Sequence, residues 1–117
     1  MSEPTPTTAS LVVLDYATLH HRAGSDQLVN ELLDLFLQFA PVMFADVQAA
    51  VRAGDEKLIR ETAHKIKGAT CQISAVRLVE LLEGMESEPG SVAANLLQEA
   101  ELAFRELSTV IAARLTP

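Results

Sequence analysis

Apolar residues recur every three or four positions along most of the chain, and this spacing is typical of one buried helix face. The first such segment begins at Leu14, where Asp15 is expected to cap a short helix that packs Leu14 against Leu19 and ends near Gly24. Ser25 or Gly24 then caps a longer helix, whose apolar positions include Leu28, Val29, Leu32, Leu33, Phe36 and Phe39. Pro41 interrupts the pattern, but the apolar residues between 42 and 51 continue it in phase, so we predict one kinked helix that reaches Arg52 or Ala53.

Three further helices are predicted in the second half of the chain. Gly54 ends the long helix, Asp55 caps the next one, which runs to about Ile73, and Ser74 can cap a fourth. Residues 88–91 have turn chemistry, and a fifth helix follows from about Val92 to Leu115. Its predicted inner stripe is Leu96, Leu97, Ala100, Phe104, Leu107, Val110 and Ile111. Side chains expected to pack in the core include Phe36, Phe39, Phe44 and Phe104. The predicted fold is all-α, an antiparallel four-helix bundle with a short leading N-terminal helix.

The composition narrows the possible functions. The chain has 117 residues, of which 49% are hydrophobic, so we expect one bundle domain over residues 11–117 after a flexible lead-in over residues 1–10. Nine basic and 16 acidic residues give a net charge of −7, which argues against nucleic acid or an anionic membrane as a partner. The single cysteine, Cys71, excludes an internal disulfide and a multi-cysteine zinc site. With no signal peptide and no evident membrane span, the expectation is a cytoplasmic monomer.

The helix predicted over residues 55–73 carries the most informative chemistry. At about 100° per residue, its apolar and small residues share one arc, and His64 lies almost opposite the centre of that arc. We therefore expect His64 on the solvent face of the bundle. Its neighbours on the wheel are Lys57, Arg60, Lys67, Gly68 and Cys71.

Charge around this histidine is opposite in sign to that of the whole chain. The three lysines are Lys57, Lys65 and Lys67, and residues 57–77 hold five basic groups against one acid, a balance of +4 that leaves −11 elsewhere. Nearby cations favour a neutral, nucleophilic imidazole and would also hold a phosphoryl group. Gly68 costs about 1 kcal/mol relative to Ala in mid-helix, and it leaves the imidazole accessible to another molecule. The pattern predicts a histidine that handles phosphate.

The string from His64 to Ala69, His-Lys-Ile-Lys-Gly-Ala, with Ala75 and Leu78 after it, resembles the signature of histidine-containing phosphotransfer (HPt) domains. The resemblance covers nearly the whole chain, including Leu35-Phe36-Leu37, Gly54-Asp55 and Leu82-Glu83. It implies that His64 is phosphorylated on Nε2, that Lys67 steadies the phosphoryl group and that Gly68 makes room for the partner. The family usually has a second glycine where this chain has Ser74, which we expect to turn or cap the junction instead.

The resemblance also implies partners. They are response-regulator receiver domains, whose aspartate exchanges phosphate with His64, and a sensor or hybrid histidine kinase. Lys57, Arg60 and Cys71 are candidate docking residues. The chain shows no Gly-rich nucleotide loop and no acidic pair for Mg²⁺, so it is expected to need no cofactor of its own and to be a carrier rather than an enzyme, with Mg²⁺ on the receiver.

Other interpretations remain open from the sequence. His64 could be an ordinary surface histidine and the bundle an interaction module without phosphotransfer. The chain could also be the phosphotransfer domain of a chemotaxis-type kinase, although its end at Pro117 favours a free-standing carrier or an excised domain of a hybrid kinase. Lys65 is expected to be peripheral and Cys71 to be a small filler. His20 and His21 point to different sides of their helix, which disfavours a metal site.

Overall fold

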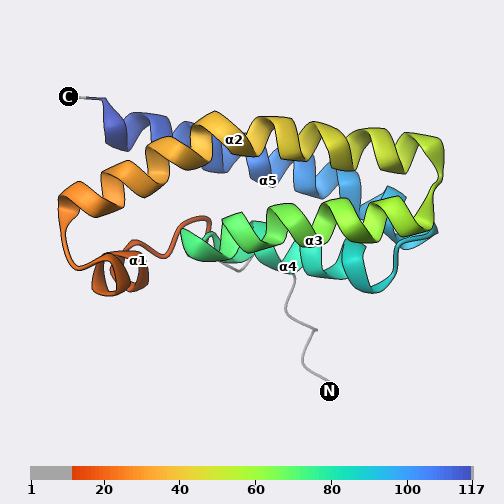
Figure 1. Cartoon of the computed structure of the whole chain (residues 1–117), viewed down its shortest axis with the longest axis horizontal. Helices are drawn as coiled ribbons and strands as arrows, with labels where there is room; N and C mark the ends of the chain where they lie inside the picture. The colour runs from red at the N-terminus through yellow and green to blue at the C-terminus, as the bar shows by residue number, and fades with distance from the viewer. Residues whose placement is uncertain (1–11, 117) are drawn as a thin grey trace, which may run out of the picture.

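The structure, a computed structural model, describes residues 12–116 and contains five helices in that range (Figure 1). They are α1 (Tyr16–Ala23), α2 (Asp26–Ala53), α3 (Glu56–Gln72), α4 (Val76–Ser87) and α5 (Ser91–Leu115). Helices α2 to α5 form the antiparallel bundle and α1 leads into it, so the predicted all-α fold is confirmed. The lead-in predicted over residues 1–10 lies outside the described residues.

Local capping explains why three of the helices begin where the sequence predicts. The side chains of Asp15, Ser25 and Asp55 each accept a hydrogen bond from the backbone N–H three residues later, at 3.1, 3.2 and 3.1 Å. Gly24 and Gly54 end α1 and α2 with φ of +88° and +66°, a left-handed conformation that glycine adopts without strain. The chain therefore reverses direction at Gly54-Asp55 and lays α3 against α2.

Helix α2 is the longest element, with 28 residues, and it continues through Pro41. Its first part is inclined to the rest in Figure 1, as expected for a helix that contains a proline. It is also long and apolar enough to pass a length-and-hydropathy test for a membrane span. That is weak evidence, because seven α2 residues are buried in the core of this bundle and the core helix of a soluble protein passes the same test.

The core differs from the prediction at several apolar positions. The most buried large side chains include Leu33, Ile66, Leu82, Leu107 and Ile111. Phe36 and Phe44 are also buried, and Phe44 stacks on the partly buried Phe104. The side chains predicted to face inward that are exposed instead are Leu28, Phe39, Val42, Leu58 and Val110. Periodicity places a residue on a helix face, but the neighbouring helices decide how much of that face is covered.

The junction between α3 and α4 is built differently from the prediction. Ala75 is the residue that precedes α4, and no side chain caps that helix. Ser74 lies one residue earlier, in the turn, with φ of +59°, the left-handed conformation that favours glycine. The buried Ser74 hydroxyl accepts a 2.6 Å hydrogen bond from Arg22 of α1. Ser74 is therefore a turn residue, as one of the two expectations had it, and not a helix cap.

Helix α1 is attached by one buried side chain and by several polar contacts. Leu19 is its one residue in the buried core. Arg22 donates to the carbonyls of Cys71 and Gln72 at the end of α3, as well as to Ser74. Near the start of α2, Asp26 accepts a hydrogen bond from Tyr16. These contacts hold α1 across the end of α3, away from the α2–α3 turn.

The Ser74 junction predicts an ordering of stabilities for two variants. Ser74→Ala loses the Arg22 hydrogen bond and keeps the left-handed strain, so it should lower the free energy of unfolding by about 1 kcal/mol. Ser74→Gly loses the same bond but relieves strain of about 1 kcal/mol, so it should be close to wild type. In an Arg22→Ala background, Ser74→Gly should become stabilising. Urea denaturation of the wild type, the three single variants and the Arg22→Ala, Ser74→Gly double variant measures this, and equal effects of Ala and Gly at position 74 would contradict it.

Candidate functional site

His64 stands on the outer face of α3, as the helix wheel predicts. The buried residues of α3 are Ile59, Ala63, Ile66 and Thr70, and they define the face that packs on the core. His64 projects away from this face, and 69% of its side chain is exposed. The imidazole is therefore accessible to another macromolecule while its helix is fixed by the core.

The closest charged group to His64 is a carboxylate from the next helix. Glu86 of α4 places Oε1 2.7 Å from Nδ1 of His64. An ionised carboxylate only accepts hydrogen bonds, so Nδ1–H donates and the lone pair of the neutral ring lies on Nε2. The expectation that cations ring this histidine is thus incomplete, because its contact on the α4 side is acidic.

Lys67 pairs with the same carboxylate. Its Nζ lies 2.6 Å from Oε2 of Glu86, and only 22% of each side chain is exposed. The contact with Lys67 lowers the pKa of Glu86 below its ordinary value, and the hydrogen bond from His64 lowers it further. Partial desolvation of the carboxylate opposes this shift without cancelling it. The same carboxylate raises the pKa of Lys67. The ion pair is therefore fully formed between the acidic range, where Glu86 would protonate, and the strongly alkaline range, where Lys67 would lose its proton.

Gly68 lies one turn beyond His64 and faces open space. A Cβ built on Gly68 would meet nothing within 4 Å outside its own helix turn, so packing within the chain does not demand a glycine there. Gly84 of α4 is a contrasting case, because a Cβ there would lie 2.8 Å from the Leu96 side chain. The bare surface at Gly68 is compatible with the close approach of a partner.

The remaining candidates on α3 are dispersed along its exposed surface. Lys57, Arg60 and Cys71 are all exposed, as is Lys65. Lys57 and Arg60 lie one to two turns before His64 and Cys71 lies two turns after it. The structure therefore brings together His64, Lys67 and Glu86, whereas Lys57, Arg60 and Cys71 share the face of His64 without entering this cluster.

Sequence reasoning missed Glu86, although a signal for it exists. Two antiparallel helices joined by a tight turn bring residues at similar distances from that turn to the same level. His64 lies 10 residues before Ser74 and Glu86 lies 12 residues after it. Searching the mirrored positions of the predicted hairpin for a carboxylate would have suggested Glu83 and Glu86. Choosing between them requires the rotation of α4 about its axis, which the structure supplies.

An apolar stripe runs along the outer side of α2. We define it by its exposed members, Leu28, Leu35, Phe39 and Val42. The last two are 59% and 66% exposed. At about 100° per residue, the stripe lies about 100° from the core-facing centre of α2. Gln48 and Phe44, which contact α5, lie on the other side of that centre, so the stripe borders α3.

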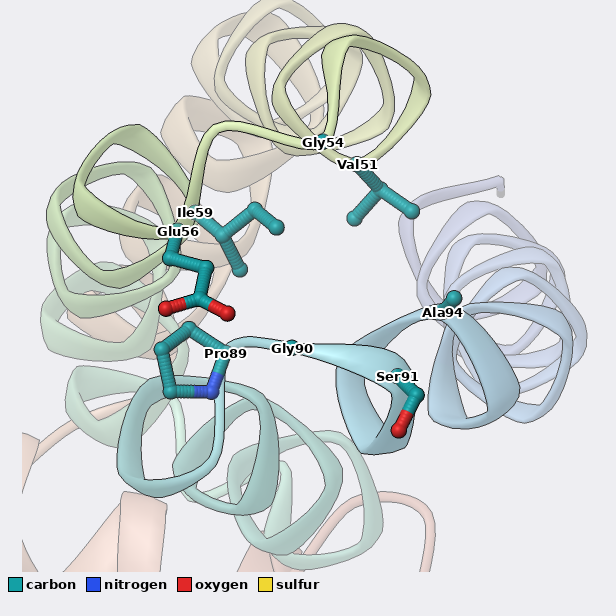
Figure 2. Close-up of a pocket in the computed structure, with 8 residues that line it drawn as sticks. All are labelled: Val51, Gly54, Glu56, Ile59, Pro89, Gly90, Ser91 and Ala94. Carbon is teal, nitrogen blue, oxygen red and sulfur yellow. The ribbon is translucent and has the colours of Figure 1, made fainter.

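A recess lies at the end of the bundle where the α2–α3 and α4–α5 turns meet (Figure 2). It has a volume of about 310 Å³. Its lining residues are Val51, Gly54, Glu56, Ile59, Pro89, Gly90, Ser91 and Ala94. Glu56 is the one charged side chain among them, and a carboxylate repels phosphate. Eight residues along α3, or about 12 Å of helix, separate Glu56 from His64.

Metal-ligating side chains are not clustered in the described part of the chain. No group of three or more His, Cys, Asp or Glu side chains within residues 12–116 is arranged to hold a metal ion. His20 faces Asp26, with Nε2 3.0 Å from Oδ1, and His21 is exposed on the same helix. The His64–Lys67–Glu86 cluster is thus a proton- and anion-handling arrangement of one imidazole, one ammonium and one carboxylate.

Comparison with known proteins gives two matches. The family model for the Hpt domain matches residues 31–113, which include all of the cluster. The structure resembles the crystal structure of histidine-containing phosphotransfer protein B (HptB) from Pseudomonas aeruginosa, with a TM-score of 0.75 and 26% sequence identity. The alignment covers 91% of this chain and 96% of the other. No curated protein sequence matches the chain significantly.

Proposed function

Because this chain belongs to the Hpt domain family, whose members carry phosphoryl groups on histidine in phosphorelays, we propose that His64 is its phosphorylated residue. The observation that carries this proposal is the 2.7 Å contact between His64 Nδ1 and Glu86. It fixes the proton on Nδ1 and leaves Nε2 as an exposed nucleophile. His20 contacts Asp26 through Nε2 itself, so its outer nitrogen is not free in the same way.

The transfer step follows from this arrangement. The Nε2 lone pair forms an N–P bond with the phosphoryl group of a receiver aspartyl phosphate while the P–O bond to the aspartate breaks and the carboxylate leaves. The imidazole ring becomes cationic as the N–P bond forms, and the Glu86 carboxylate at Nδ1 stabilises that charge. Transfer to the next receiver is the reverse of this step.

Lys67 and Gly68 have separate roles in the proposal. Lys67 lies one turn from His64, close enough for its ammonium to reach phosphoryl oxygens on Nε2. Gly68 leaves room for the receiver backbone near the imidazole. Lys57 and Arg60 are exposed on the same face, where their charges would attract an acidic receiver active site and raise the association rate.

The partners in the proposal are receiver domains and a sensor or hybrid histidine kinase. The receiver would supply Mg²⁺ and most of the stabilisation of the transition state, so the chain would need no cofactor or turnover of its own. We propose in addition that it is monomeric and cytoplasmic. Hpt domains as a family are phosphotransfer carriers, which supports this assignment. The net charge of −7 supports a protein partner over nucleic acid or membrane.

The surface around His64 favours a receiver that docks over α2 rather than over α4. A transient protein interface still needs several hundred Å² on each partner, centred on an apolar area. Phe39 and Val42 of the apolar stripe provide such an area beside α3, whereas Glu83 and Glu86 lie on the α4 side. Cys71 lies at a similar level on α3 and would be covered by the same partner.

Phe39→Asp should test this docking face. The variant removes an exposed apolar contact and places a charge in the proposed interface, so phosphotransfer from a receiver should slow by about 30-fold. Thermal stability should stay near wild type because Phe39 is 59% exposed. Leu102→Asp on α5 is the matched control, since Leu102 is 62% exposed, and it should transfer normally. Equal rates for both variants would contradict docking over α2.

The proposed function is tested directly with a panel of ³²P-labelled phosphorylated receiver domains. Incubation with the chain should move label from at least one receiver to the chain, and peptide mapping should find it on His64. The linkage should be labile to acid and stable to alkali, as a phosphoramidate bond is. Binding to receivers without any transfer of label would favour an interaction module instead.

A further inference from the structure

Lys67 has two possible partners in the proposed function, and the structure shows it bound to one of them. Its Nζ lies 2.6 Å from Oε2 of Glu86, and this ion pair occupies the ammonium before any phosphoryl group arrives. The other oxygen of Glu86, Oε1, is held by His64 Nδ1 at 2.7 Å. The Glu86 carboxylate therefore contacts both His64, the proposed nucleophile, and Lys67, the cation proposed to bind the phosphoryl group on His64.

A phosphoryl group on Nε2 would have to draw Lys67 away from this position. Nε2 lies on the side of the imidazole ring opposite Nδ1, so the phosphoryl oxygens extend away from Glu86. Oε2 of Glu86 is shielded from solvent, and apart from the Lys67 ion pair it accepts no hydrogen bond. If the ammonium leaves, Oε2 loses this ion pair, and a carboxylate oxygen without a partner is costly.

We propose that Glu86 lowers the stability of the phosphorylated state by competing with the phosphoryl group for Lys67. The inference rests on the proposed function of His64. Glu86 then has two opposed effects on the phosphorylated state: its contact with Nδ1 stabilises the cationic phosphohistidine ring, and its ion pair with Lys67 disfavours retention of the phosphoryl group. Glu86 is a positioning residue that acts through His64 and Lys67. By lowering the stability of phosphohistidine, it would help the carrier to pass its phosphoryl group to the next receiver.

The experiment uses phosphoramidate, a small donor that needs no receiver. In this reaction Nε2 displaces ammonia from phosphorus, so an N–P bond forms as another breaks and the ammonia takes up a proton. The equilibrium constant follows from ³¹P NMR of phosphohistidine and phosphoramidate at fixed ammonium concentrations. Glu86→Gln can still accept from Nδ1–H through its amide oxygen but releases Lys67. We expect this constant to rise about tenfold, as for the loss of one charged hydrogen bond.

A double-mutant cycle shows whether the gain operates through Lys67. In a Lys67→Met background, Glu86→Gln should no longer raise the equilibrium constant and should lower it instead, because the competition no longer exists and a neutral amide stabilises the cationic ring less than a carboxylate does. Glu83→Gln is the matched control on α4. It removes one nearby exposed negative charge that has no direct contact with Lys67, so its effect should be less than threefold. Thermal melts of each variant check that the bundle is folded.

The outcomes separate this inference from the proposed function. An unchanged constant in Glu86→Gln, or a gain that persists in the Lys67→Met background, would overturn the competition while leaving His64 as the phosphorylated residue. A wild-type chain that takes no phosphoryl group at His64, from either phosphoramidate or the receiver panel, would overturn both.

Discussion

The His64→Gln variant should accept no phosphoryl group from any phosphorylated receiver domain. The glutamine amide can occupy the same surface, but it has no nitrogen lone pair that can attack phosphorus, so the loss should be complete rather than partial. Because 69% of the His64 side chain is exposed, the change in the free energy of unfolding should stay within about 0.5 kcal/mol. The measurement is ³²P transfer from the receiver that labels the wild-type chain.

Two other histidines provide the control for this result. His20 and His21 lie on α1, so a His20→Gln, His21→Gln double variant should take up label as wild type does. Label retained on the His64→Gln variant would refute the assignment of His64. Normal receiver binding by that variant, measured by calorimetry, would show that docking and chemistry are separable on this surface.

Gly68→Gln should stabilise the bundle and impair transfer at the same time. A Cβ at this position meets no neighbouring atom within 4 Å, and replacing a mid-helix glycine by a good helix former contributes up to about 1 kcal/mol. The melting temperature should therefore rise by several degrees. Transfer from a receiver should fall more than tenfold, because the added side chain stands where the partner must approach His64.

The size of the donor separates this steric effect from damage to the imidazole. Phosphoramidate is small, so it should phosphorylate Gly68→Gln at a rate near that of wild type, and Gly68→Ala should give an intermediate rate with receivers. Gly84→Ala is the structural contrast: its Cβ would lie 2.8 Å from Leu96, so that variant should lose stability. If Gly68→Gln transferred normally from receivers, the glycine would have no role in admitting the partner.

The parts of the fold that depend on local chemistry could be predicted from the sequence. Asp15, Ser25 and Asp55 cap helices through backbone groups three residues away, so short stretches of sequence contain the relevant information. The outward position of His64 is likewise a property of one helix. The structure contains these features as the sequence predicts them because local preferences and tertiary packing favour the same conformation here.

Features that depend on two helices could not be predicted in the same way. Phe39 has the spacing of a core residue, and only the placement of the helices around α2 leaves it exposed. Glu86 contacts His64 because of the way α4 is rotated about its axis. The apolar pattern of the sequence does not define that rotation closely enough to choose between Glu83 and Glu86. Ser74 offers a third case, since its left-handed backbone is supported by a hydrogen bond from Arg22, 52 residues earlier in the chain.

The sparse attachment of α1 has a consequence for how the molecule opens. With Leu19 as its one residue in the buried core, α1 contributes little to the cooperative unit formed by α2 to α5. Its amides should therefore exchange with solvent through a local opening that needs less free energy than global unfolding. Such an opening would release Arg22 from the end of α3 but would leave the His64–Glu86 hydrogen bond in place. The local opening of α1 should therefore leave phosphotransfer at His64 unaffected.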